Sequence, residues 1–164
     1  MWAEAVEAPD RSRAEELRGS LQAIAAEEAD TDALDMEREM LEALDALVEL
    51  SDVVSTQGPA TIPTGHRAVG ADSCFFSAPA SLPDDPAQPS GTLLLTSTRL
   101  IFVGGAKSVT VPWHSVSECV RQDRDLLIAR ADRQDVQRLR CNAFADALCA
   151  TFLARHLAIR LRRV

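Results

Sequence analysis

The side chains of this 164-residue sequence that could do chemistry are four cysteines, three histidines and a pair of adjacent aspartates. The cysteines stand 45, 22 and 8 residues apart, so none of them forms the close C-x-x-C pair that is typical of a zinc site. The acidic N-terminus, MWAEAVEAPD, lacks the apolar segment of a secretory signal. We therefore expect a cytoplasmic location, no metal site, and free buried thiols at Cys74, Cys119, Cys141 and Cys149.

Two other arrangements resemble parts of an active site. Cys119 and His114 lie close enough in sequence to form a nucleophile and its base, but a single Cys and His at this spacing are common and no oxyanion loop accompanies them. Asp84 and Asp85 stand in a proline-rich loop, where we expect solvated carboxylates. Gly104-Gly105 lacks the flanking residues of a phosphate-binding loop and predicts a hairpin turn. The sequence thus predicts no catalytic residue, no cofactor and no enzymatic activity.

The charge of the chain is divided unevenly along its length. Residues 1–90 carry nineteen acidic and five basic side chains, whereas residues 91–164 carry six acidic and twelve basic ones. Such asymmetry is typical of an interacting segment, and it equally fits two halves that attract each other. The Arg residues of the second half alternate with Asp, which predicts ion-paired surface strands and argues against nucleic-acid binding.

The acidic half begins with two amphipathic helices, predicted over residues 10–28 and 32–50, which form an N-terminal helical region of residues 1–54. Apolar residues recur at helical spacing on the second helix, while glutamates cover its other side. A helix pair of this size cannot bury its stripe alone, so it packs on its own domain, forms a coiled-coil dimer, or docks another protein. The residues expected at a helix-mediated interface are Leu34, Leu41, Leu44 and Val48.

After a linker predicted over residues 55–65, the pattern changes to short strands. Apolar runs at 92–95, 100–103 and 109–111 are separated by polar and glycine residues, as in successive antiparallel strands. We place a first strand within 66–76, an exposed loop over 79–89, a turn at 114–118, and later strands at 119–121, 126–129 and 136–140. A helix then follows Asn142, with an apolar face that includes Phe144, Leu148 and Phe152.

The middle of the chain resembles a known domain family. Gly91-Thr92-Leu93-Leu94-Leu95-Thr96, then Arg99-Leu100-Ile101-Phe102, then Val111-Pro112-Trp113 is similar to the G-x-L-x-L-T-x-x-R-L-I-F…(I/V)-P-(W/L) pattern of GRAM domains and related bacterial PH-like (pleckstrin-homology-like) domains. The resemblance covers about residues 64–160. It implies an α+β fold in which a barrel of about seven antiparallel strands is capped by a C-terminal helix, here preceded by the helical pair.

The resemblance also implies where a ligand would bind. PH-like domains that bind phosphoinositides usually use Lys and Arg in and near the first inter-strand loop, because these cations neutralise phosphate. The corresponding loop here, residues 79–89, has no Lys or Arg and contains two Asp. Cations elsewhere are candidates for contact with a lipid or a protein partner, namely Arg67, Arg99, Lys107, Arg121, Arg138 and Arg140.

These observations predict a PH-like domain over residues 66–164 in a non-catalytic binding or scaffolding protein. It would act through protein–protein interaction or self-association, and no nucleic acid is involved. The alternative is a peripheral membrane module that binds anionic lipid headgroups through its Arg-rich strands. The helical start of the chain also leads us to expect a piece of a larger protein.

Overall fold

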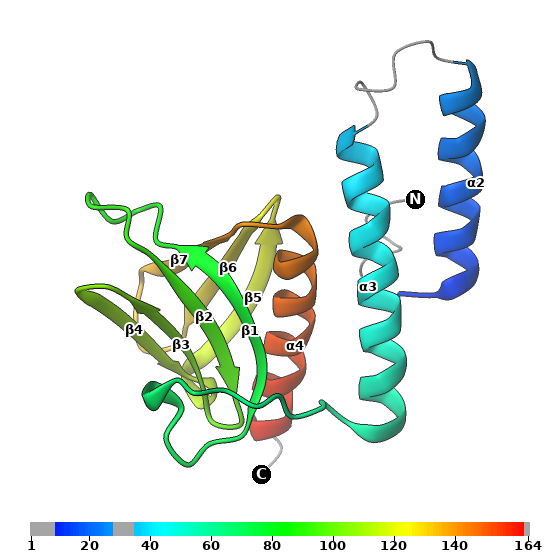
Figure 1. Cartoon of the computed structure of the whole chain (residues 1–164). Helices are drawn as coiled ribbons and strands as arrows, with labels where there is room; N and C mark the ends of the chain where they lie inside the picture. The colour runs from blue at the N-terminus through cyan, green and yellow to red at the C-terminus, as the bar shows by residue number, and fades with distance from the viewer. Residues whose placement is uncertain (1–8, 28–34, 163–164) are drawn as a thin grey trace. The chain divides into compact units, whose positions relative to one another are not determined.

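The computed structural model describes residues 9–27 and 35–162. The chain forms two compact units, Met1–Gly58 and Pro59–Val164, which are described separately. Figure 1 shows the helices of the first unit in blue to green and the sheet and last helix of the second in green to red. None of the helices described is long and apolar enough to cross a membrane.

The first unit contains two antiparallel helices, α2 (Arg11–Glu27) and α3 (Asp35–Gln57). Asp10 begins α2 as a cap, because its carboxylate accepts a hydrogen bond from the Ser12 backbone N–H at 3.2 Å. Ion pairs join the two helices at Arg18–Asp45 and at Arg11–Asp52. The predicted end of the first helix at residue 28 and the predicted start of the second at residue 32 lie outside the described residues.

The second helix is longer than the sequence predicted. It continues past Leu50 to Gln57, so the first residues of the predicted 55–65 linker are helical. Gly58 ends it with a φ of 79° and donates its N–H to the Val54 carbonyl at 3.0 Å, as a glycine after a helix commonly does. Val54 is buried, and this burial outweighs the low helix propensity of the valine, serine and threonine residues in the last turns.

The second unit is built on one antiparallel sheet of seven strands in the order β4-β3-β2-β1-β7-β6-β5. The strands are β1 (Cys74–Ser81), β2 (Ser90–Thr96), β3 (Arg99–Gly104), β4 (Lys107–Pro112), β5 (Val116–Gln122), β6 (Asp125–Arg130) and β7 (Val136–Cys141). The strand number and the capping helix agree with the predicted fold class. The sheet does not close into a barrel, however, because β4 and β5 are its two edges and are not paired with each other.

The sheet changes direction at β1. This strand pairs with β2 over its whole length but with β7 only at Ala80 and Ser81. The strand therefore belongs to both halves of a strongly bent sheet, as at the corner of a sandwich. In Figure 1 the two halves of the sheet curve toward each other, and α4 (Phe144–Arg162) lies along one side of them.

Both faces of β2 and β3 are buried. Leu93, Leu95 and Phe102 lie on one face, and the cross-strand pair Leu94 and Ile101 lies on the other. The second face is covered by the segment before β1, where Val69 and Cys74 join Leu94 and Ile101 in a cluster against which Ile62 packs. This covering explains why the runs TLLL and LIFV are continuous rather than alternating.

The first strand is displaced from its predicted position. Residues 67–69 form a 3₁₀ turn, η2 (Arg67–Val69), and the strand begins at Cys74 and continues through Pro79 to Ser81. Pro79 is tolerated because its carbonyl, which accepts from the Asn142 N–H at 3.3 Å, points away from β2. Its ring nitrogen points the same way, so no hydrogen bond to β2 is lost.

A third correction concerns the segment predicted as a turn at 114–118. A 3₁₀ turn, η3 (Trp113–Ser115), replaces its first part, and Val116 is already the buried first residue of β5. Helix α4 buries a broad face that includes Phe144, Leu148, Leu153 and Leu157, whereas the predicted anchor Phe152 is only half-buried. Several alanines on this face let the helix approach the sheet closely.

Candidate functional site

The residues of the GRAM-like pattern form a rigid turn between β2 and β3. Thr96 is fully buried; its hydroxyl donates to the Arg99 carbonyl at 2.8 Å and accepts from the Arg99 N–H at 3.2 Å. The fully buried Trp113 donates its indole N–H to the Thr96 carbonyl at 2.8 Å. Asp72 receives the Thr98 hydroxyl at 2.7 Å and lies 3.4 Å from Nε of Arg99. The pattern therefore holds the fold together and offers no open site.

Close backbone packing explains the first residue of the same pattern. A Cβ on Gly91 would lie 2.1 Å from the carbonyl oxygen of Val103 on the neighbouring strand. A side chain at this position would force β2 and β3 apart, so only glycine fits.

At the opposite end of the sheet, the loop between β1 and β2 contains the paired carboxylates Asp84 and Asp85. Asp85 forms an ion pair with Lys107, the first residue of β4, and accepts the Ala87 N–H at 2.9 Å. The hydrogen bond from Lys107 holds the pKa of Asp85 below its ordinary value. Asp84 lies 3.6 Å from Arg138. The loop thus carries its own anions, which meet cations of the neighbouring strands.

A second carboxylate at this end is buried. Asp125, the first residue of β6, is 3% exposed and accepts hydrogen bonds from Nε of Arg138 and Nε of Arg140, each at 2.7 Å. Asp125 and Arg140 are cross-strand partners, and Arg138 lies two residues along β7 on the same face. Hydrogen bonding from Arg140, and less strongly from Arg138, lowers the pKa of Asp125 against the opposing effect of burial.

The structure separates the six cations named as candidate contacts. Lys107, Arg138 and Arg140 gather at the loop end of the sheet, each paired with a carboxylate. Arg121 donates to the Asp123 carbonyl at 2.7 Å, and its guanidinium lies 4.8 Å from the centre of the Phe144 ring.

The two remaining cations lie away from the loop end. Arg99 is at the opposite end of β3 and is bound to Asp72. Arg67 in η2 is exposed and forms no ion pair with any residue that the structure describes. The six side chains therefore do not form one continuous basic surface.

The candidate helix interface is also divided. Leu44 and Val48 of α3 are buried, Leu41 is half-buried, and Leu34 lies outside the described residues. Among the three of these residues that the structure describes, Leu41 is the most accessible, and an interface formed by them stays a prediction.

The cysteines are poor nucleophiles. Burial raises the pKa of Cys119 and of Cys141 to about 12 and that of Cys149 to about 11. Such thiols stay protonated at neutral pH and do not react as thiolates. Within residues 9–27 and 35–162, no three His, Cys, Asp or Glu side chains come together in a group that could hold a metal ion.

The sequence missed Asp72 and did not single out Asp125 among the acidic residues of the later strands. One signal was available for Asp125, because Arg138-Leu139-Arg140 alternates in a strand and so presents two arginines on one face. Two cations on one face of a strand repel each other, which favours a carboxylate opposite them on a paired strand.

Neither a protein-family model nor a curated protein sequence matches this chain. Among solved structures, the Vps36 N-terminal PH domain is 11% identical over 66% of this chain and 92% of its own length, with a TM-score of 0.50. The C-terminal domain of an unknown protein from Leishmania infantum is 12% identical over 55% of this chain and 88% of its own, with a TM-score of 0.48.

The DH/PH domains of PDZ-RhoGEF, in a structure with activated RhoA, are 13% identical over 90% of this chain and 53% of their own, with a TM-score of 0.47. The likeness to the Vps36 domain concerns the fold and does not extend to function, because identities this low carry no residue correspondence.

Proposed function

We propose that this chain, part of which has the fold of a pleckstrin-homology domain, is a non-catalytic binding module that acts through protein–protein interaction or self-association. The observation that carries the proposal is the pairing at the loop end of the sheet. Lys107 meets Asp85, and Asp125 takes both Arg138 and Arg140. A phosphate group approaching these cations would have to displace carboxylates that are already bound to them.

The proposal includes a relationship between this chain and GRAM domains, for which the GRAM-like pattern is the evidence. Its residues do structural work at the turn between β2 and β3, where Thr96, Arg99 and Trp113 are bound to one another or to backbone. Because these residues stabilise the fold, the pattern favours a fold shared with GRAM domains and gives no indication of a shared ligand.

Vesicle co-sedimentation of the full chain tests the proposal against its alternative, the binding of anionic lipid headgroups. The comparison uses anionic and neutral liposomes at about 20 mM and about 150 mM salt, because screening separates electrostatic binding from other binding. We expect the protein to stay in the supernatant in all four conditions. Sedimentation with anionic liposomes alone, lost at the higher salt, would replace protein binding by the lipid alternative.

Light scattering over a range of protein concentrations separates the two forms of the proposal. A mass that rises with concentration, and that stays monomeric in a shortened chain of residues 60–164, would assign self-association to the helical region. A constant monomeric mass leaves binding to another protein.

A further inference from the structure

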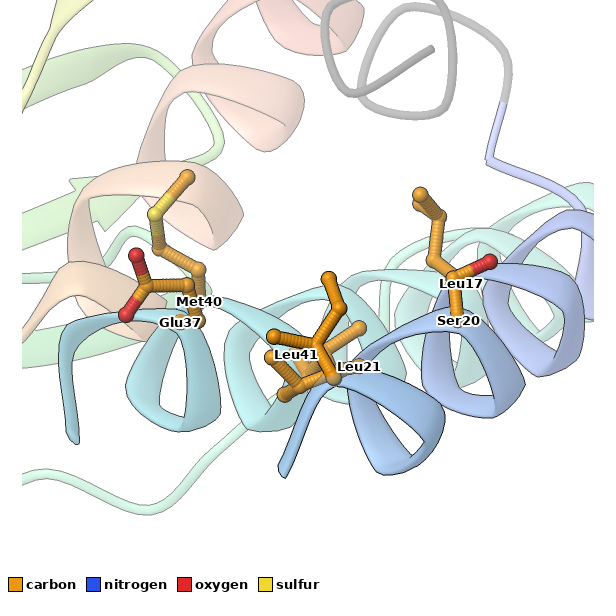
Figure 2. A pocket seen from close by; sticks show the side chains of 7 residues that line it. Leu17, Ser20, Leu21, Glu37, Met40 and Leu41 are labelled. Carbon is orange, nitrogen blue, oxygen red and sulfur yellow. The ribbon is translucent and has the colours of Figure 1, made fainter. Parts of the chain in front are cut away.

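The helices of the first unit leave an apolar pocket open between them. The pocket has a volume of about 290 Å³ and lies between α2 and the first half of α3. In Figure 2, Leu21 of α2 and Leu41 of α3 occupy the middle of the view, with Leu17 and Ser20 on one side and Glu37 and Met40 on the other. Ile24 completes the lining.

The apolar surface continues beyond the pocket. Ile24 is 49% exposed, and Met36, one helical turn before Met40, is 61% exposed. Methionine side chains adapt their shape to whatever packs against them. A groove between two helices with apolar residues at i, i+4 and i+7 along α2 has the shape that the apolar face of a third helix fills.

The negative charge around the groove determines which kind of helix could bind there. Glu37 lies in the lining itself, and residues 1–58 carry sixteen acidic side chains against four arginines. Two of those arginines, Arg11 and Arg18, are bound to Asp52 and Asp45 nearer the other end of the helix pair. A second copy of this region would bring the same excess of negative charge to the groove and be repelled, whereas a basic segment would be attracted.

We propose that the groove between α2 and α3 binds a basic amphipathic helix of another protein. Apolar residues of that helix would enter the pocket between Leu21 and Leu41, and its Lys and Arg residues would lie near Glu37. The inference rests on the proposed function and names the surface and the chemistry of the partner.

The test uses the full chain and a defined probe. The probe is a fluorescein-labelled peptide of about 18 residues, five helical turns, with leucines on one face and lysines on the other. A peptide of the same composition, with its leucines spread around the helix, serves as the control. Fluorescence anisotropy is expected to show saturable binding of the amphipathic peptide, weakened between about 50 mM and about 300 mM salt, and no saturable binding of the control.

Matched variants assign the binding to the groove. Glu37→Lys is compared with Glu42→Lys, an exposed glutamate on α3 that does not line the pocket. Ile24→Ser is compared with Val53→Ser, since both side chains are exposed and only Ile24 lines the pocket. We expect each groove variant to lower the affinity for the amphipathic peptide by about fivefold or more, and each control variant to lower it by less than about twofold. Far-UV circular dichroism of all four variants checks whether they keep their helices.

Three outcomes would overturn the inference. They are no saturable binding, equal binding of the two peptides, and equal effects of groove and control variants. None of these outcomes would contradict the proposed function. That proposal would be contradicted by binding of the protein to anionic liposomes. A concentration-dependent mass that Ile24→Ser reduces would assign the groove to a second copy and likewise overturn the basic partner.

Discussion

Asp125 shows how much one buried carboxylate can organise. Its two oxygens receive guanidinium groups from two arginines on the neighbouring strand, and it stands 13 and 15 residues before them in the chain. Removing the charge would leave the half-buried Arg138 and the exposed Arg140 without this anion, and the loss at the half-buried cation costs more than at an exposed one.

We expect Asp125→Asn to lower the free energy of unfolding by about 1 to 3 kcal/mol, the range for lost hydrogen bonds to charged groups. Asp123→Asn is the matched control, because Asp123 is exposed, accepts Arg121 only through its carbonyl, and has a φ of 51° that asparagine also adopts. Urea denaturation followed by circular dichroism measures both. Equal stabilities of the two variants would contradict the role given to Asp125.

The same residue gives stability a defined pH dependence. Because hydrogen bonding holds the folded-state pKa of Asp125 below its unfolded value of about 3.9, its contribution is complete above that pH and is lost as the pH falls through the folded value. The difference in unfolding free energy between wild type and Asp125→Asn should therefore be constant from about pH 6 to 5 and shrink below about pH 4. A difference that grows on acidification would contradict this sign.

At the scale of elements, the segment before β1 acts as part of the core. Val69 and Ile62 cover the outer face of β2 and β3, and the Ile62 N–H donates to the Cys74 carbonyl at 2.8 Å. Ile62 from the predicted linker and Val69 from the predicted first strand thus together protect Leu94 and Ile101 from water.

Val69→Ala is expected to destabilise the protein by about 2 kcal/mol, from the buried methyl groups lost and the cavity left. Val136→Ala makes the same change at a side chain that is 51% exposed and should cost less than about 0.5 kcal/mol. Thermal or urea unfolding compares the two. Similar costs at both positions would show that the segment does not cover the sheet in solution.

The elements that local pattern predicts well are those whose neighbours in space are neighbours in sequence. The β2–β3–β4 meander follows from three apolar runs and the glycine-containing turn between β3 and β4, and its predicted strands were confirmed. The start of β1 was wrong because residues 67–69 form a 3₁₀ turn, and its end was wrong because Pro79 indicates a loop. Only the pairing of β1 shows that the proline ring nitrogen faces away from β2. The end of α3 was wrong because residues 53–56 favour other structures until Val54 is buried.

The candidate site depended on contacts of still longer range. Alternation of Arg and Asp predicted ion pairs, but not that Asp84 and Asp85 would meet Arg138 and Lys107 across loops. Those partners are set by the order of the strands, which places β4 and β7 on either side of β1 and β2, and no local pattern encodes that order.

At the scale of the whole molecule, the fold alone does not identify a function. The division into two units falls after Gly58, and independent roles for the domains predicted at 1–54 and 66–164, joined by a 55–65 linker, stay a proposal. The two units differ sharply in charge, so the acidic helices and the ion-paired sheet would select different partners.

The loop carboxylates provide a test at this scale. In the double variant Asp84→Asn and Asp85→Asn, Lys107 loses its anion and Arg138 loses one of two. We expect this variant to gain binding to anionic liposomes at about 20 mM salt relative to wild type. Glu42→Gln with Glu49→Gln changes the net charge equally on α3 and should gain none. Equal gains would assign the effect to net charge alone.

The four free cysteines, of which Cys74, Cys119 and Cys141 are buried and Cys149 is only half-buried, can serve as native labelling sites that report local opening. Cys74, Cys119, Cys141 and Cys149 stand on β1, β5, β7 and α4, so each reports on a different element. Because Cys119 and Cys141 are buried and their thiolate formation is suppressed, a thiol reagent can label them only when the surrounding structure opens, whereas the half-buried Cys149 is more accessible. The order in which mass spectrometry finds them labelled would rank the local opening rates of the domain without the introduction of any probe.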